Sequence, residues 1–281
     1  MTQEVVQFLW TNGKLGTMER LSLASFLKTG HTVHLYTYES VENVPEGVDV
    51  KNGNEIIPQS FLDYRKFINH GTFADFFRYK LLLDKGGWWS DSDVVSLRHF
   101  SFIEDYVFGC MGPYPYQEPA PPKKRSLRQP PRPYPEKTKD WPGAWVCNAV
   151  MKAPKNSGVM HYAWNECLKF DPARISWSEQ VGPKLLDKAV RVNSLHPYVK
   201  NTNYFNFVAP EYVKNFSDPQ FPWTFPKEAH AIHLWNDMWS GRLNYEERET
   251  WQITGCPPIL QSKETVVKGS LYGDLVSRYL P

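Results

Sequence analysis

Residues 73–95, FADFFRYKLLLDKGGWWSDSDVV, carry the strongest pattern in this chain. The apolar residues at the start of this stretch recur at helical spacing, so they predict a helix over residues 72–85. Thr72 with Asp75 three positions later is typical of a helix cap. The two glycines that follow end the helix. An apolar strand over residues 88–95 comes next, and two carboxylates interrupt it.

Outside this stretch, strand-like and helix-like segments alternate along the chain. The first three, a strand, a helix and a strand, are typical of a parallel βαβ unit. No segment repeats at a fixed period, which excludes solenoids and propellers. We therefore predict one α/β domain over residues 1–281, with a Rossmann-like mixed central sheet flanked by helices. The predicted strands are residues 5–10, 32–38, 145–152, 204–209 and 229–235, and the other predicted helices are residues 18–27, 161–168 and 179–192.

The composition is that of an ordinary globular protein. Its 281 residues include 41% hydrophobic and 22% charged residues, which argues against disorder. The net charge of +2 gives no general electrostatic case for nucleic acid. The start lacks a secretory signal pattern and no apolar run approaches the ~18 residues of a membrane span, so we expect a cytoplasmic protein. The four cysteines lack a Cys-x-x-Cys pair and are interpreted as free thiols: Cys110, Cys147, Cys167 and Cys256.

Residues 113–142 differ from the rest in composition. Ten of these thirty residues are proline, and seven basic against three acidic side chains give the segment a net charge of +4. Proline at this density excludes a central strand or a regular helix, so we predict an inserted surface loop. Such a basic loop could contact the acceptor or an anionic membrane surface, serve as a lid, or be an inert linker. Residues 237–281 are expected to form a C-terminal extension.

Asp91 and Asp93 are the most informative charged pair. On a strand, residues two apart point to the same side, so the two carboxylates are predicted to lie together. Placing two carboxylates side by side next to Trp88 and Trp89 costs free energy unless a cation joins them. Carboxylate oxygens are ligands that suit Mg²⁺ or Mn²⁺. Ligands of α/β sheets bind at the carboxyl ends of strands, where this pair is expected. The alternative is a solvated Asp-Ser-Asp turn.

About twenty positions around this pair agree with a known signature in order and spacing. They run Ala74-Asp75-x-x-Arg78, then three leucines, then Gly86-Gly87-Trp88-x-x-Asp91-x-Asp93. This pattern resembles the glycosyltransferases with the "DXD" sugar-binding region, in the GT-A group (family 32-like). That group includes α-mannosyl- and α-galactosyltransferases, capsular polysaccharide enzymes and the glucosylating clostridial toxins. The resemblance implies a GT-A fold and a nucleotide-sugar donor.

The resemblance also implies roles for individual residues. Trp10 matches a tryptophan that stacks on the nucleotide base, and Asp75 and Arg78 match residues that contact the nucleotide-sugar. Asp93 matches the usual metal ligand, whereas Asp91 matches a residue that contacts the ribose and donor sugar and can share the metal. Trp10 could equally be a core aromatic, and Asp75 with Arg78 could form a local ion pair.

Several further positions are matched more weakly. Asn148 resembles an asparagine near the donor sugar and joins Asp91 and Asp93 in the implied catalytic set, although it could be a buried residue bonded to backbone. The Gln180–Gly182 segment resembles a "TGP" donor segment in which Gln-Val replaces the usual threonine. His233 matches a C-terminal metal ligand, or is an ordinary strand histidine. Trp235 and Asn236 follow His233 and are assigned to the donor site.

The function implied by the resemblance is a metal-dependent, retaining glycosyltransferase. It would use Mn²⁺ or Mg²⁺ to transfer a hexose from a UDP-sugar, with a GDP-sugar as the alternative donor. The acceptor would be a saccharide or glycolipid, in surface polysaccharide or lipopolysaccharide synthesis, with the enzyme cytoplasmic or peripheral at the inner membrane surface. Two other classes stay open: a haloacid-dehalogenase-type phosphohydrolase with Asp91 as nucleophile, and a non-catalytic sugar-binding protein.

Overall fold

A computed structural model describes residues 5–67, 70–111, 145–175, 180–239 and 262–280. The predicted insertion 113–142, Cys256 and residues 240–261 of the predicted C-terminal extension lie outside these ranges. The strands are β1 (Val5–Trp10), β2 (Thr32–Thr37), β3 (Asp49–Asn52), β4 (Gly87–Ser90), β5 (Val94–Ser96), β6 (Val107–Met111), β7 (Trp145–Ala153) and β8 (Ala231–His233). The α-helices are α1 (Thr17–Lys28), α2 (His70–Lys85), α3 (Gly158–Cys167), α4 (Pro183–Val192), α5 (Asn236–Trp239) and α7 (Leu271–Tyr279).

Six strands form one mixed sheet in the order β3-β2-β1-β4-β7-β6. Strands β1 to β4 run parallel to one another, whereas β7 pairs antiparallel with both β4 and β6. The parallel pairing of β1 with β2 on either side of α1 confirms the predicted βαβ unit. The mixed α/β sheet flanked by helices is as predicted.

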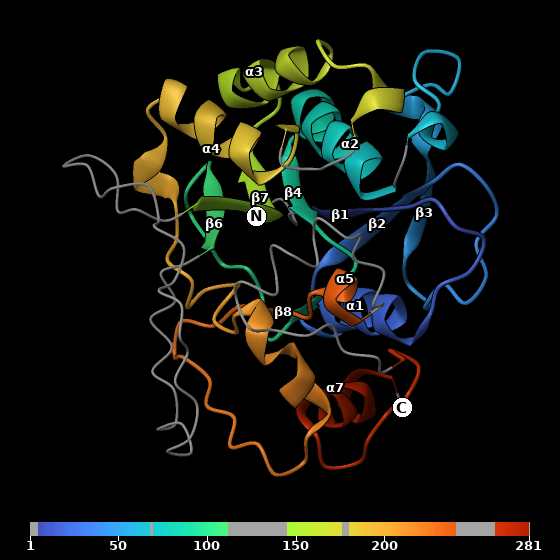
Figure 1. The fold of residues 1–281 in the computed structure, drawn as a ribbon, viewed down its shortest axis with the longest axis vertical. Helices are drawn as coiled ribbons and strands as arrows, with labels where there is room; N and C mark the ends of the chain where they lie inside the picture. The colour runs from blue at the N-terminus through green and yellow to red at the C-terminus, as the bar shows by residue number, and fades with distance from the viewer. Residues whose placement is uncertain (1–4, 68–69, 112–144, 176–179, 240–261, 281) are drawn as a thin grey trace.

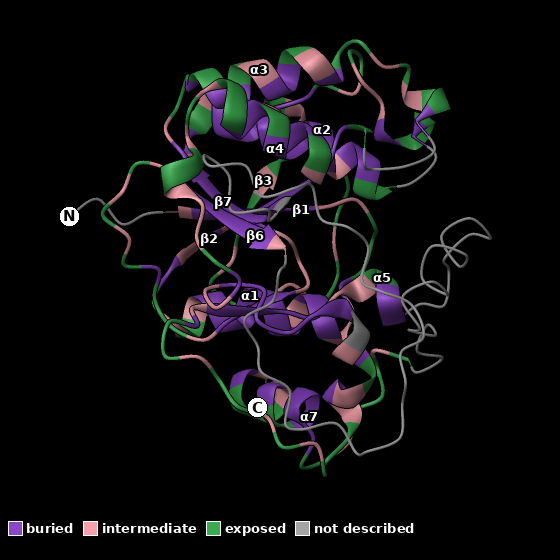
Figure 2. Ribbon diagram, turned by 60° about the vertical axis from the view of Figure 1, so that its left-hand side comes forward, coloured by how far each residue is buried: buried purple, intermediate pink, exposed green. Residues whose placement is uncertain are grey.

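The helices cover both faces of this sheet and give three layers (Figures 1 and 2). Helices α2, α3 and α4 lie on one side of the sheet and α1 lies on the other, with α7 packed beyond α1 (Figure 1). Between the sheet and α2, the core contains closely packed aromatic rings, including Phe73, Phe77 and Trp89. The opposite core places Phe8 against Phe26 of α1, with ring centroids 5.2 Å apart. These apolar contacts hold the carboxyl ends of the strands in fixed positions.

The strand order reverses between β1 and β4. From β1 the chain first proceeds outward to β2 and β3, and then returns through α2 to β4 on the other side of β1. At such a reversal the two connecting segments leave the sheet in opposite directions, which opens a crevice at the carboxyl ends of the strands. Trp10 ends β1 and Asp91 follows β4, so both residues lie at this reversal point.

The link from α2 to β4 requires glycine. Gly86 has φ +68°, and a Cβ there would come within 2.5 Å of the backbone nitrogen of Lys155. Gly87 also has a positive φ, of +90°. The predicted end of the helix at these glycines is confirmed, and the tight turn delivers the chain directly into β4.

Three sequence-based predictions of local structure are wrong. The helix α2 already includes His70, so Thr72 is not its cap but a buried residue inside it, as is Asp75. Residues 204–209 are not a strand, because their backbone is irregular. Residues 88–95 are not one strand either: residues 91–93 form a turn between β4 and β5. In the two strand segments the apolar pattern reflects burial in the core rather than a continuous strand. Within the described part of the predicted helix 179–192, α4 extends from Pro183 to Val192.

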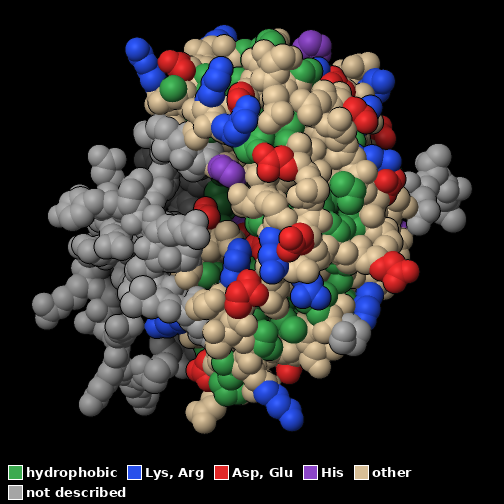
Figure 3. Space-filling model, turned by 90° about the vertical axis from the view of Figure 1, so that its right-hand side faces the viewer, with side chains coloured by type: hydrophobic (Ala, Val, Ile, Leu, Met, Phe, Trp, Pro, Cys, Tyr) green, Lys and Arg blue, Asp and Glu red, His purple; other side chains and the backbone are tan. Residues whose placement is uncertain are grey.

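The described part of the C-terminal segment packs against α1. Glu264 accepts hydrogen bonds from the backbone nitrogen and hydroxyl of Thr17 at the start of α1, and Lys263 pairs with Glu19. Charged side chains of both signs are interspersed over the described part of the face shown in Figure 3. Within the described residues, no helix is both long and apolar enough to cross a membrane.

Candidate active site

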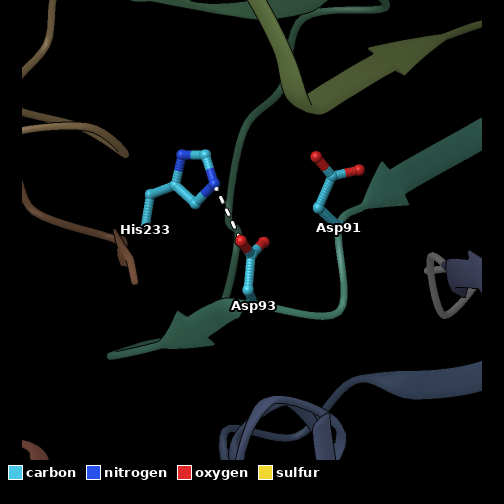
Figure 4. A group of neighbouring side chains, drawn as sticks. All are labelled: Asp91, Asp93 and His233. Carbon is cyan, nitrogen blue, oxygen red and sulfur yellow. Dashed lines mark ion pairs between the residues drawn. The ribbon is translucent and has the colours of Figure 1, made fainter. Parts of the chain in front are cut away.

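Two short strands bring the predicted metal ligands together. Strand β5 pairs antiparallel with β8, and Val94 lies opposite His233 in their register. The backbone nitrogen of Leu234 donates to the carbonyl of Asp93 at 2.8 Å. The imidazole of His233 therefore lies beside the turn that carries Asp91 and Asp93 (Figure 4). The prediction that the two carboxylates lie close together holds, but the turn between β4 and β5 places them there rather than strand alternation.

The group formed by Asp91, Asp93 and His233 fits a metal ion. Each residue offers one ligand atom, and these atoms all lie within 4.8 Å of one another. The Oδ2 atom of Asp93 lies 3.3 Å from Nε2 of His233 and accepts from the backbone nitrogen of Asn236 at 2.8 Å. Its Oδ1 atom is buried and has no hydrogen-bond partner among the described residues. Because a buried unpaired oxygen is costly, a cation bound beside this atom could supply the partner that it lacks.

The charges of this group depend on one another. Burial alone would lower the pKa of His233, but the adjacent Asp93 outweighs it and raises that pKa to about 10. Burial alone would raise the pKa of Asp93, but His233 and the bond from Asn236 lower it. Burial raises the pKa of Asp91, against the effect of Arg78. In the absence of a metal, a proton on His233 thus offsets the charge of Asp93.

A second network, built around Arg78 of α2, borders the first. Its Nη1 lies 3.0 Å from Oδ1 of Asp91, and its Nη2 lies 3.2 Å from Oδ1 of Asp75. The guanidinium also donates to the carbonyl of Asn148 at 2.7 Å and stacks over Trp89. The indole of Trp89 donates to the same Oδ1 of Asp91 at 2.8 Å. Arg78 is only 4% exposed, so its position is fixed and it in turn fixes Asp91.

Asp75 is the most deeply buried carboxylate of this network. Its Oδ1 accepts from the side-chain nitrogen of Asn148 at 2.7 Å, whereas its buried Oδ2 has no partner among the described residues. Burial raises the pKa of Asp75 to about 7, even though Arg78 opposes the shift. The side chain of Asn148 is thus bonded to a carboxylate, while its backbone carbonyl binds Arg78.

The other predicted site residues lie at different distances from this centre. Trp235 has a positive φ of +56° and stacks on His233 with ring centroids 4.0 Å apart. Asn236 contacts Asp93 through its backbone nitrogen.

Trp10 lies at the end of β1, and its indole donates to the backbone carbonyl of Lys14. Gln180 is exposed, and Gly182 accepts from Tyr79 of α2, so this segment touches the helix behind Arg78 rather than the metal group.

Sequence reasoning missed the residues that hold this site in place. Asn206 contacts the far side of the His233 ring at 3.2 Å. Lys263 donates to the side-chain oxygen of Asn236 at 3.0 Å and pairs with the buried Glu19. Neither residue belongs to a local motif, and Asn206 falls in a segment predicted as strand. Only contacts between distant parts of the chain reveal them.

Comparisons with known proteins show likeness of structure only. No family profile matches the chain, and no curated protein matches its sequence. Among solved structures, the PaToxG glycosyltransferase is similar over 68% of this chain and 69% of its own, with 13% identity and a TM-score of 0.47. A transferase with two cysteine-to-serine changes covers 69% and 87%, with 9% identity and a TM-score of 0.40. A further transferase covers 67% and 86%, with 10% identity and a TM-score of 0.35. Because all three TM-scores are below 0.5, these likenesses assign no function to this chain.

Proposed function

We propose that this protein is a metal-dependent glycosyltransferase of the GT-A type, which transfers a hexose from a nucleotide-sugar. One observation carries the proposal: Asp91, Asp93 and His233 converge beside the strand-order reversal, and Oδ1 of Asp93 is buried there without a described partner. Carboxylate oxygens and one imidazole nitrogen suit Mn²⁺ or Mg²⁺, and such ions usually keep positions for substrate phosphates.

The chain's own residues would position the ion and the donor. Asp93 and His233 would hold the cation, and Asp91 would face it from a position set by Arg78 and Trp89. A cation bound there would supply positive charge for the leaving diphosphate. Trp10 ends the strand next to β4, so we assign its ring to the nucleotide base.

The buried network suggests how the sugar would be held. Oδ2 of Asp75 has no described partner, so we assign it and the adjacent Asn148 to hydroxyl groups of the donor sugar. We assign Arg78 chiefly to the orientation of Asp91 and Asp75, since its guanidinium already binds both. Trp235, Asn236 and the residues 180–182 would form other parts of the donor pocket.

We propose that the reaction retains the configuration of the sugar without a covalent intermediate. Asp75 and Asp91 are paired with Arg78, and Asp93 is paired with His233. None of these three carboxylates is thus placed as an independent nucleophile. Attack of the acceptor on the same face, with the leaving phosphate accepting the proton, requires no further protein base. UDP-sugars are the first donors to test, followed by GDP-sugars, and the acceptors would be saccharides or glycolipids.

Slow hydrolysis of the donor tests this proposal before any acceptor is known. The protein is incubated with Mn²⁺ and a set of UDP- and GDP-sugars, and the released nucleotide is measured by chromatography. We expect Asp93→Asn to lower hydrolysis at least about 100-fold, because a lost metal contact removes several kcal/mol of charge stabilisation. Asp171→Asn, which removes an exposed carboxylate beyond α3, should have no effect. Absence of both hydrolysis and donor binding with every donor contradicts the proposal.

The phosphohydrolase alternative makes a different prediction. A nucleophilic Asp91 would have to attack through Oδ2, because Arg78 and Trp89 both occupy its Oδ1. Trapping a beryllium fluoride adduct on Asp91, seen by mass shift or ¹⁹F NMR, would favour that class. A non-catalytic sugar-binding protein would bind donors and Mn²⁺ but release no nucleotide.

A further inference from the structure

Asn206 lies against the side of the His233 ring that faces away from the carboxylates. Its Oδ1 atom is 3.2 Å from Nδ1 of His233, while Nε2 of the same ring faces Asp93 at 3.3 Å. Asn206 is 1% exposed and His233 is 8% exposed, so water is largely excluded from this contact. A hydrogen bond in such surroundings determines which ring nitrogen keeps its hydrogen when the ring is neutral.

The orientation of the Asn206 amide is fixed by a second contact. Its Nδ2 atom donates to the backbone carbonyl of Cys110 in β6 at 3.1 Å. A carbonyl oxygen can only accept, so the amide nitrogen must face Cys110 and the amide oxygen must face His233. The backbone nitrogen of Asn206 donates to the carbonyl of Thr202, which holds the residue itself in place.

A glycine in β6 leaves room for this contact. A Cβ at Gly109 would lie 3.3 Å from Nδ2 of Asn206, a tight contact that glycine avoids. The register of β6 with β7 shifts between Phe108 and Gly109, and the additional residues of this irregularity, 148–150, belong to β7. The backbone carbonyl of Cys110 thus lies within reach of the Asn206 amide.

These contacts determine the state of the ring. An amide oxygen accepts only from a protonated nitrogen, so Nδ1 of His233 carries a hydrogen. In a neutral imidazole the lone pair then lies on Nε2, which faces Asp93. Nε2 and the carboxylate would repel each other unless a proton or a metal ion lies between them. The ring is thereby prepared to bind a cation through Nε2 only.

We propose that Asn206 is a positioning residue, which holds His233 in the tautomer and orientation that present Nε2 to a divalent cation shared with Asp91 and Asp93. This inference rests on the proposed function, because it assigns a supporting partner to the same site. Histidines that bind metals usually donate their other ring hydrogen to such a partner, and losing that partner costs about 10–100-fold in metal affinity.

Two substitutions separate orientation of the ring from simple support of the fold. Asn206→Asp keeps an acceptor for Nδ1 but loses the bond to Cys110, whereas Asn206→Leu loses both. We expect Mn²⁺ affinity, measured by calorimetry, to fall at least about 10-fold in Asn206→Leu and to be retained in Asn206→Asp. Asn193→Leu, which removes an amide bonded to a backbone carbonyl at the end of α4, is the control and should leave affinity unchanged.

A measurement without metal provides a second test. In ¹H–¹⁵N NMR of the metal-free protein, the Nδ1 hydrogen of His233 should give a downfield, exchange-protected signal. The signal should persist in Asn206→Asp and disappear in Asn206→Leu. Circular dichroism establishes that each variant folds, and Asn206→Ser, whose hydroxyl is too short to reach the ring, replaces Asn206→Leu if the latter does not fold.

The outcomes distinguish this inference from the proposed function. Equal loss of Mn²⁺ affinity in both variants, unchanged affinity in Asn206→Leu, or an Nδ1 signal that survives in Asn206→Leu overturns the role of Asn206. Absence of Mn²⁺ binding by the unmodified protein contradicts the metal site and with it the proposed function. In that case the NMR signal alone decides whether Asn206 orients the ring.

Discussion

Two neighbouring groups of charges at the ends of β4 and β8 differ in how completely they are paired. Around Arg78, two carboxylates, a backbone carbonyl and a tryptophan ring surround one cation that is always charged. Around Asp93, the partner is a histidine, and Oδ1 has no described partner at all. We call the first group the closed unit because the guanidinium of Arg78 is surrounded by its partners, although Oδ2 of Asp75 has no described partner there either. The second group is open to one more cation. Asp91 belongs to both and connects them.

The largest expected effect on stability comes from a substitution that breaks the closed unit. Arg78→Met leaves Asp75 and Asp91 buried without their cation, so we expect the free energy of unfolding to fall by about 3–5 kcal/mol. Urea denaturation followed by fluorescence measures it. Lys80→Met on the same helix removes an exposed pair with Asp84 and should cost only about 0.5 kcal/mol. A similar small loss in both variants would show that Arg78 does not stabilise the network.

The pH dependence of stability tests the burial of Asp75. Its pKa is raised to about 7 in the folded protein, so its contribution is fully present below the unfolded pKa near 4 and is lost as the pH rises through 7. At about 1.4 kcal/mol per pKa unit, the loss amounts to at most about 4 kcal/mol. Asp75→Asn should remove this part of the dependence, which urea denaturation at pH 4.5 and pH 8 would show. Parallel pH curves for the two proteins would contradict the assignment.

The open group should respond differently, because it is built for binding rather than stability. His233→Gln removes a ligand atom, so we expect Mn²⁺ affinity to fall about 100-fold, which corresponds to about 2.7 kcal/mol. Calorimetry measures the affinity, and His161→Gln on the exposed face of α3 serves as the matched control. Equal affinities in His233→Gln and the control would exclude the histidine from the site.

The smallest expected effect concerns the C-terminal segment. Lys263→Met removes the bond to Asn236 and leaves Glu19 without its cation, so stability should fall by about 1–2 kcal/mol. Mn²⁺ affinity should change less than tenfold, because the bond to Asp93 comes from the backbone nitrogen of Asn236. Lys268→Met, an exposed change in the same segment, is the control. A loss of Mn²⁺ affinity as large as that of His233→Gln would show that Lys263 belongs to the metal-binding site itself.

The same contrast explains what the sequence could predict. The βαβ start, helix α2 and the two carboxylates were predictable, because short-range periodicity and spacing encode them. The turn at residues 91–93 was not predictable, because the apolar residues on both sides of it have the pattern of one continuous strand. Asn206 and Lys263 could not be found either, because each meets the site through contacts across the fold. Arg78 was found through the resemblance of its motif to the DXD glycosyltransferases, but only the fold shows that both carboxylates already bind it.

One measurement tests the central claim most directly. Crystals grown with Mn²⁺ and UDP or GDP can be measured at the manganese absorption edge, where anomalous scattering locates the ion. We predict one strong peak per chain among the carboxylates of Asp91 and Asp93 and Nε2 of His233, and none in crystals of Asp93→Asn. A peak at another place, or an empty cluster at millimolar Mn²⁺, would contradict the claim that this open group is a metal site.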